Sequence, residues 1–176
     1  MASYRLIQTA TITSLTAAVT FSSIPQTFED LLIMGIGRSD YGNNITNFRV
    51  RLNNDTGSFY YWYLQYSFNS TPTTNTNAKA STYGNSGIVA ATDGVAISSP
   101  AYMYLSNYTN TGSNKAWQSL TGAEMPFASS TFYGAYQGSN NYAPTSDAAI
   151  TTISLIPQQG TGWVAGTSYS LYGISN

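Results

Sequence analysis

Short runs of apolar residues, broken about every eight to twelve positions by Gly, Pro, Asn or Asp, constrain the fold of this chain most strongly. Within several runs apolar and polar residues alternate, as they do along a strand with one buried and one exposed face. No window combines helical periodicity with capping residues. The pattern predicts an all-β fold, a jelly-roll-like antiparallel β-sandwich, and the length of 176 residues suits a single domain spanning 1–176.

The expected strands share this apolar character and end at turn residues. Alternation is clearest in 47–52, where Phe48, Val50 and Leu52 are expected to face the core. The segment 31–37 is almost entirely apolar, which predicts a central strand covered on both faces. The expected strands are 4–13, 19–21, 31–37, 47–52, 59–68, 87–91, 95–97, 101–105, 115–120, 130–136, 149–156 and 164–174.

Polar segments between these strands are expected to be turns and loops. The Asn-Asn-Asp-Thr-Gly sequence of 53–57 predicts a turn, because Asn, Asp and Gly tolerate positive φ. Thr-Asp-Gly at 92–94 is a plausible hairpin turn. Polar loops are expected at 106–114 and 138–141. The segment 70–81 contains no large apolar residue, which predicts an exposed polar loop.

The composition argues against catalysis. The chain contains neither His nor Cys, so it lacks the usual general base, the commonest metal ligand and the most reactive nucleophile. Glu29 and Asp30 are adjacent carboxylates, and neighbours in a strand point to opposite faces. Oxygens of the 53–57 turn could approach Ca²⁺, but one carboxylate, Asp55, is few for that ion. We expect no enzyme activity, catalytic residue, cofactor or metal.

Charge and hydropathy exclude two further classes of partner. Net charge is −1, and among the six basic residues only Arg49 and Arg51 lie close in sequence, which disfavours nucleic-acid binding. No segment reaches the roughly 18 apolar residues of a membrane span, and the N-terminus lacks a secretory pattern, so synthesis in a cytoplasm is expected. A near-neutral surface favours association with other proteins.

Aromatic residues provide the best binding candidates. They make up 14% of the chain, and four stand together as Tyr60-Tyr61-Trp62-Tyr63. Alternation sends about half of these rings into the core. The outward half could form a subunit interface or stack on a sugar. Candidates for interface or glycan contact are Tyr60, Tyr61, Trp62, Tyr63, Tyr102, Tyr104, Tyr133 and Tyr136.

Several blocks occur in an order that resembles a known family. The closing segments are AITTISL at 149–155 and GWVAGTSYSLYGI at 162–174; earlier ones are FSSIPQTFEDL at 21–31 and VRLNNDTGSFY at 50–60. Asn107-Tyr108 ahead of Lys115 resembles the middle block more loosely. Together they resemble a family of tailed-bacteriophage virion proteins found in phages of cyanobacteria and other aquatic bacteria.

The resemblance implies a jelly-roll-like sandwich on the exterior of a virion, with no catalytic residue. The first hypothesis is a head decoration (cement) protein that contacts the major capsid protein and itself as a dimer or trimer. Absence of a long shaft segment favours this location. The second is a receptor-binding domain of a tail fibre or spike that recognises host surface glycans. A third is a lectin-like bacterial module unrelated to phages.

Overall fold

The computed structural model describes residues 2–43, 45–68, 74–91, 98–123, 134–145 and 148–175. Within these ranges the chain forms twelve strands and no helix. The strands are β1 (Ser3–Thr11), β2 (Val19–Phe21), β3 (Asp30–Gly37), β4 (Ile45–Leu52), β5 (Tyr60–Phe68), β6 (Thr74–Ser81), β7 (Gly84–Ala90), β8 (Ser99–Leu105), β9 (Lys115–Ala123), β10 (Gly134–Tyr142), β11 (Ile153–Pro157) and β12 (Ser168–Ser175).

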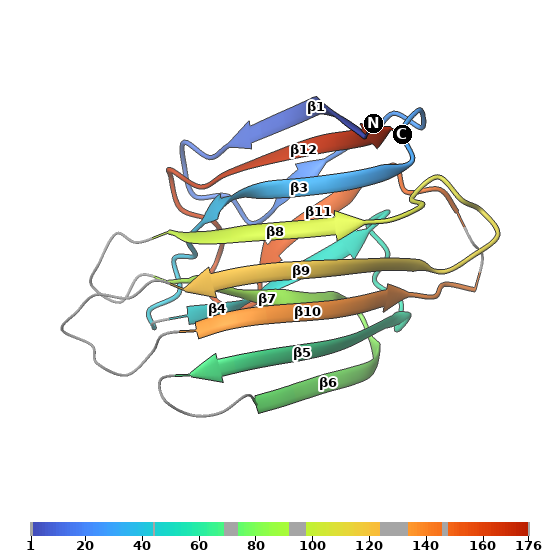
Figure 1. The fold of residues 1–176 in the computed structure, drawn as a ribbon. Helices are drawn as coiled ribbons and strands as arrows, with labels where there is room; N and C mark the ends of the chain where they lie inside the picture. The colour runs from blue at the N-terminus through green and yellow to red at the C-terminus, as the bar shows by residue number, and fades with distance from the viewer. Residues whose placement is uncertain are drawn as a thin grey trace.

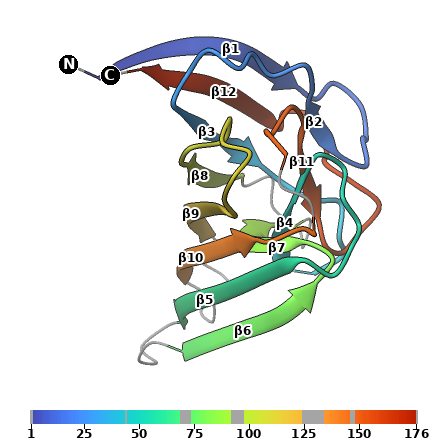
Figure 2. The same ribbon diagram turned by 90° about the vertical axis from the view of Figure 1, so that its right-hand side faces the viewer.

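Two antiparallel sheets face each other. The larger has eight strands in the order β1-β12-β3-β8-β9-β10-β5-β6, and the smaller has four in the order β2-β11-β4-β7. Figure 1 looks onto the larger sheet, which runs from β1 at the top to β6 at the bottom. In the turned view of Figure 2, β2, β11, β4 and β7 lie to the right of the larger sheet as the second layer. The predicted all-β sandwich is therefore confirmed.

The strand order is that of a jelly roll. The chain forms four antiparallel pairs, which are β1/β12, β2/β11, β3/β8 and β4/β7. The first strand pairs with the last, and each further pair lies inside the preceding one in the sequence, as in a jelly roll. Pairs β12/β3 and β11/β4 join them into two sheets. The topology confirms the predicted jelly-roll-like arrangement.

Two inserted hairpins enlarge one sheet. Strands β5 and β6 lie between β4 and β7 in sequence, and β9 and β10 lie between β8 and β11. The two insertions pair with each other through β5 and β10, while β9 pairs with β8. The four-stranded side of the jelly roll thereby becomes a continuous eight-stranded sheet.

The core between the sheets centres on three aromatic rings. Trp163 packs edge-on against Phe48 and Tyr169, with ring centroids 6.0 and 5.5 Å apart. Phe48 and Tyr169 stack at 5.9 Å, and all three side chains are fully buried. The Trp163 Nε1–H donates to the carbonyl of Leu155 at 2.8 Å, which satisfies the polar atom of the indole.

Strand β7 is buried at every position and packs against the inserted part of the larger sheet. Small and polar residues permit this close approach. Gly87 has φ of 125°, and a Cβ there would lie 2.1 Å from Oγ1 of Thr121. The Nε1–H of Trp117 donates to Oγ of Ser86 at 2.9 Å across the same interface.

Two predicted loops prove wrong. Within 70–81, residues Thr74–Ser81 form the edge strand β6, because backbone pairing with β5 requires no buried apolar side chain. Residues 138–141 lie inside β10. Gly138 fits there because a Cβ would meet Oγ of Ser119 at 2.5 Å.

Other differences concern strand ends. The last predicted strands begin later than expected, at Ile153 rather than 149 and at Ser168 rather than 164. The turn at 53–57 is confirmed by positive φ at Asn53 and Asn54. The expected hairpin turn at 92–94, with the strand 95–97, and the beginning of the strand 130–136 lie outside the described residues.

A hydrogen-bonded carboxylate joins the loop after β3 to the loop before β12. The carboxylate of Asp40 accepts hydrogen bonds from the backbone N–H of Thr161 at 2.7 Å and of Gly162 at 2.9 Å, and from the Thr161 hydroxyl. Burial alone would raise the pKa of Asp40, but these hydrogen bonds outweigh it and hold the pKa below 3.8.

A carboxylate whose pKa is lower in the folded than in the unfolded state stabilises the fold at pH values above its unfolded pKa. This stabilisation is lost as the pH falls through the folded pKa. We therefore expect Asp40→Asn to lose less stability than the wild type between pH 5 and roughly pH 3. Urea unfolding of both proteins at the two pH values measures the difference. An identical acid dependence would show that this carboxylate is not linked to folding.

Candidate functional site

The face of the eight-stranded sheet that points away from the smaller sheet is the candidate site, here termed the outer face. Cross-strand register defines it. Met34 of β3 lies opposite Tyr102 of β8, which lies opposite Leu120 of β9. Their neighbours in sequence, such as Ile33 and Met103, point into the core.

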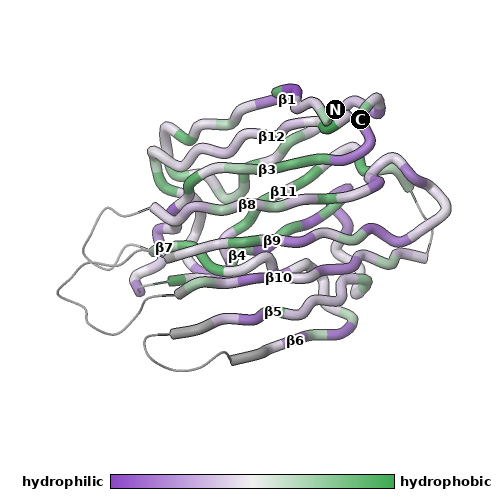
Figure 3. Tube along the Cα trace, in the orientation of Figure 1, coloured by the Kyte–Doolittle hydropathy of each residue, from purple (hydrophilic) through white to green (hydrophobic). Residues whose placement is uncertain are grey.

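One part of the outer face is apolar. Six side chains in it are 41–63% exposed, although all are large and hydrophobic; they are Tyr4, Leu6, Met34, Ile36, Tyr102 and Leu120, and we term them the apolar patch. A hollow of about 540 Å³ lies within it, between Met34, Tyr102 and Leu120, where Gly122 and Ala135 leave room. In Figure 3 the hydrophobic colour runs along β3 and reappears in β9.

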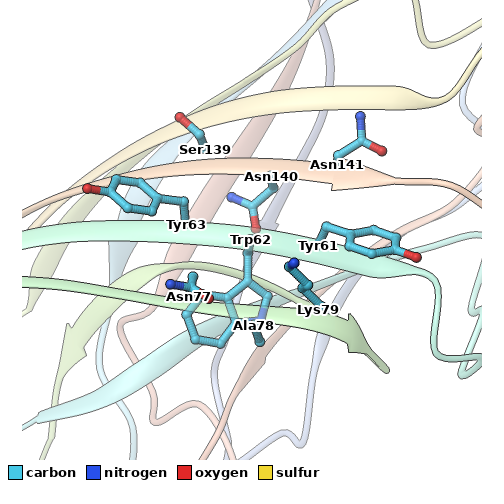
Figure 4. A pocket seen from close by; sticks show the side chains of 9 residues that line it. All are labelled: Tyr61, Trp62, Tyr63, Asn77, Ala78, Lys79, Ser139, Asn140 and Asn141. Atoms are coloured by element: carbon cyan, nitrogen blue, oxygen red, sulfur yellow. The ribbon is translucent and has the colours of Figure 1, made fainter.

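The other part is polar and aromatic, and lies over β10, β5 and β6. Tyr61 and Tyr63 are two residues apart in β5, so both project from the same face. They border a shallow hollow of about 480 Å³, here termed the tyrosine hollow. Figure 4 shows the two phenol rings directed away from each other, with side chains of the flanking strands around them: Asn77, Lys79, Ser139 and Asn141.

The hydrogen-bonded carboxylate of Asp30 lies beside the apolar patch. The Tyr104 hydroxyl donates to Oδ2 of Asp30, and the backbone N–H of Asn107 donates to Oδ1 at 2.8 Å. This hydrogen bond to Asp30, with burial and the nearby negative charge, raises the pKa of Tyr104 to about 12. Asp30 and Lys79 are the charged residues on the described part of the outer face, and Asp30 already accepts a hydrogen bond from Tyr104.

The structure divides the predicted aromatic residues into core and surface. Tyr60 and Tyr136 are buried and are therefore not surface contacts in this chain. Burial raises the pKa of Tyr60 to about 12, and its hydroxyl accepts the N–H of Leu52 at 3.0 Å. Trp62 is half-buried and packs with Tyr136 in a second cluster. Tyr133 lies outside the described residues.

The predicted aromatic contact residues that are not buried do not form one site. Tyr61 and Tyr63 border the tyrosine hollow, whereas Tyr102 belongs to the apolar patch and Tyr104 is bonded to Asp30. The alternation expected within 60–63 is observed, since Tyr61 and Tyr63 are exposed whereas Tyr60 is buried and Trp62 is half-buried.

Sequence reasoning missed the aliphatic part of the site. The prediction that 31–37 is covered on both faces is wrong, because Met34 and Ile36 are exposed on the outer face while Ile33 is in the core. The near-continuous apolar run was the available signal. Strand β3 therefore carries apolar side chains on both faces, with Met34 and Ile36 left exposed on the outer one.

Two further observations concern ligands and membranes. Within the described ranges, no three Asp, Glu, His or Cys residues lie close enough together to hold a metal ion. No helix in that part of the chain is long and apolar enough to cross a membrane.

Comparison of this chain with protein-family models, with curated proteins and with solved structures finds no match.

Proposed function

We propose that this protein is a structural component of a bacteriophage particle, a decoration protein on the outer surface of the head. It catalyses no reaction and acts by burying the outer face of its eight-stranded sheet against other protein. The observation that carries this proposal is the apolar patch, six large hydrophobic side chains at least 41% exposed on one sheet face. Large apolar side chains left exposed together on one face mark interaction sites.

The fold and charge support the same reading. Jelly rolls recur in viral capsid proteins and in lectins, so the fold is compatible with both candidate functions. The outer face carries little charge, which suits a permanent protein contact more than a weak, electrostatically steered one. The resemblance of the closing segment, 162–174, to phage virion proteins points to the particle.

Reconstitution of particles tests the proposal. Particles that lack the protein are incubated with the purified chain, and bound copies are counted and located by electron microscopy. We expect many copies distributed over the head and a higher temperature of head disruption. A few copies confined to the tail would contradict a role in head decoration.

A second candidate function, recognition of a host surface glycan, rests on the tyrosine hollow. Its two half-exposed phenol rings offer stacking surfaces, while Asn77, Ser139 and Asn141 offer amide and hydroxyl groups to sugar hydroxyls. A neutral, hydroxyl-rich ligand needs no charged partner, which fits the composition of the hollow.

The glycan candidate makes a distinct prediction. If sugars bind in the tyrosine hollow, Tyr61→Ala is expected to weaken binding of labelled protein to host cells at least about tenfold, equivalent to about 1.4 kcal/mol. Tyr102→Ala is the matched control, because both tyrosines are 42% exposed on the same sheet face. Equal binding by the two variants, or no binding by the wild type, would exclude this site.

A further inference from the structure

We infer that the apolar patch binds a second copy of this chain, so that two eight-stranded sheets pack face to face around a two-fold axis. This inference identifies a second copy of the chain as the protein that covers the apolar patch. It rests on the proposed function only in one respect, that the patch is a contact surface.

The exposed area is of the size that a dimer requires. With about 200 Å² for each large side chain, the exposed fractions of the six patch residues leave roughly 600 Å² of surface. A standard interface buries about 800 Å² on each partner. Polar neighbours on the same face, such as Gln118 and Gln137, lie where they would supply the remainder as a rim.

The patch contains both a projection and a recess. A two-fold interface uses the same surface on both subunits, so that surface must contain both a projection and a recess. Leu120 is the most exposed aliphatic side chain of the patch, and the hollow of about 540 Å³ lies beside it. Gly122 and Ala135, with little or no side chain, provide the recess into which the partner's projection can fit.

Charge does not oppose this contact. Identical faces brought together place like charges near one another, which costs several kcal/mol when the charges are unpaired. The apolar patch contains no charged residue, and its neighbour Asp30 is already hydrogen-bonded by Tyr104 and Asn107. The patch itself therefore brings no charged side chain into the contact.

The edges of the sheet are less suited to pairing than its face. Strand β1 carries a bulge at Ile7, between the pairs of Leu6 and Gln8. At the other edge, β6 has an extra residue opposite Tyr61, and Ala80 there has φ of 54°. Bulges and an edge lysine such as Lys79 oppose strand addition from another chain.

The oligomeric state of the purified protein tests the inference. Sedimentation equilibrium at micromolar concentration is expected to give twice the chain mass of 18.9 kDa for the wild type. Leu120→Asp, which places a carboxylate twice in a symmetric interface, is expected to weaken dimerisation more than about 100-fold. Leu15→Asp is the control, since Leu15 lies in the loop between β1 and β2 and is 55% exposed compared with 58% for Leu120.

Each outcome decides between the claims. A monomeric wild type, or a Leu120→Asp variant as dimeric as the Leu15→Asp control, overturns the dimer. Circular dichroism and urea unfolding establish that both variants are folded. A monomeric wild type that still coats phage heads would contradict the dimer alone, whereas a dimer that does not bind heads would contradict the proposed function alone.

Discussion

Replacing Trp163 with alanine is expected to lower the free energy of unfolding by about 3–5 kcal/mol, the usual cost of truncating a fully buried tryptophan. The side chain is inaccessible to solvent and packs edge-on against both Phe48 and Tyr169. Its loss opens a cavity and leaves the Leu155 carbonyl without its 2.8 Å donor. Domains of this size are stable by only about 5–15 kcal/mol, so a large part of the stability would be lost.

Urea unfolding followed by circular dichroism measures the change. Trp62→Ala is the matched control, because Trp62 is half-buried in a smaller cluster outside the main core. We expect it to cost less than half as much as Trp163→Ala. Equal costs would show that the three-ring centre does not dominate the packing between the sheets.

Asn53→Ala is expected to cost about 2–4 kcal/mol, although the residue lies in a turn. The side chain connects the turn after β4 to the segment before β11. Its Nδ2 donates to the Ala149 carbonyl at 2.9 Å, and its Oδ1 accepts the N–H groups of Thr151 and Thr152 at 2.9 and 3.2 Å. Alanine removes these three hydrogen bonds and a longer one from the Thr151 hydroxyl at 3.4 Å, and it is strained at the φ of 52°.

The adjacent residue provides the control. Asn54 has φ of 56°, so Asn54→Ala incurs the same backbone cost, but its side chain accepts one hydrogen bond, from Ser154 Oγ at 3.2 Å. The difference between the two variants isolates the side-chain contacts of Asn53, and we expect about 2 kcal/mol in urea unfolding. Similar stabilities would contradict the bridging role of Asn53.

One-sided burial is what made parts of the fold predictable. In β4, Phe48, Val50 and Leu52 are buried and alternate with less buried polar residues, so the period of two is visible in the sequence. The nested pairing of strands is not visible in this way. The partner of β1 is β12, more than 150 residues away along the chain, and local patterns carry no information about such pairings.

The composition predicted loops in places where the strands lack apolar residues. Strand β6 reads as a loop because it occupies an edge, and Asn140 reads as a loop residue although it is buried beneath β7. For the site, alternation predicts that about half of the rings in 60–63 face outward but not which half, and a loop at 70–81 gives no position for Asn77 beside them. The apolar patch was missed because an exposed aliphatic residue and a core residue look the same in a sequence.

An image reconstruction of the proposed phage particle, at a resolution that traces individual strands, tests the central claim, the burial of the outer face, most directly. We expect the jelly roll on the head, with Met34, Tyr102 and Leu120 buried in a protein contact. If those side chains instead faced solvent, while the four-stranded sheet or the loops made the contacts, the proposed role of the outer face would be contradicted.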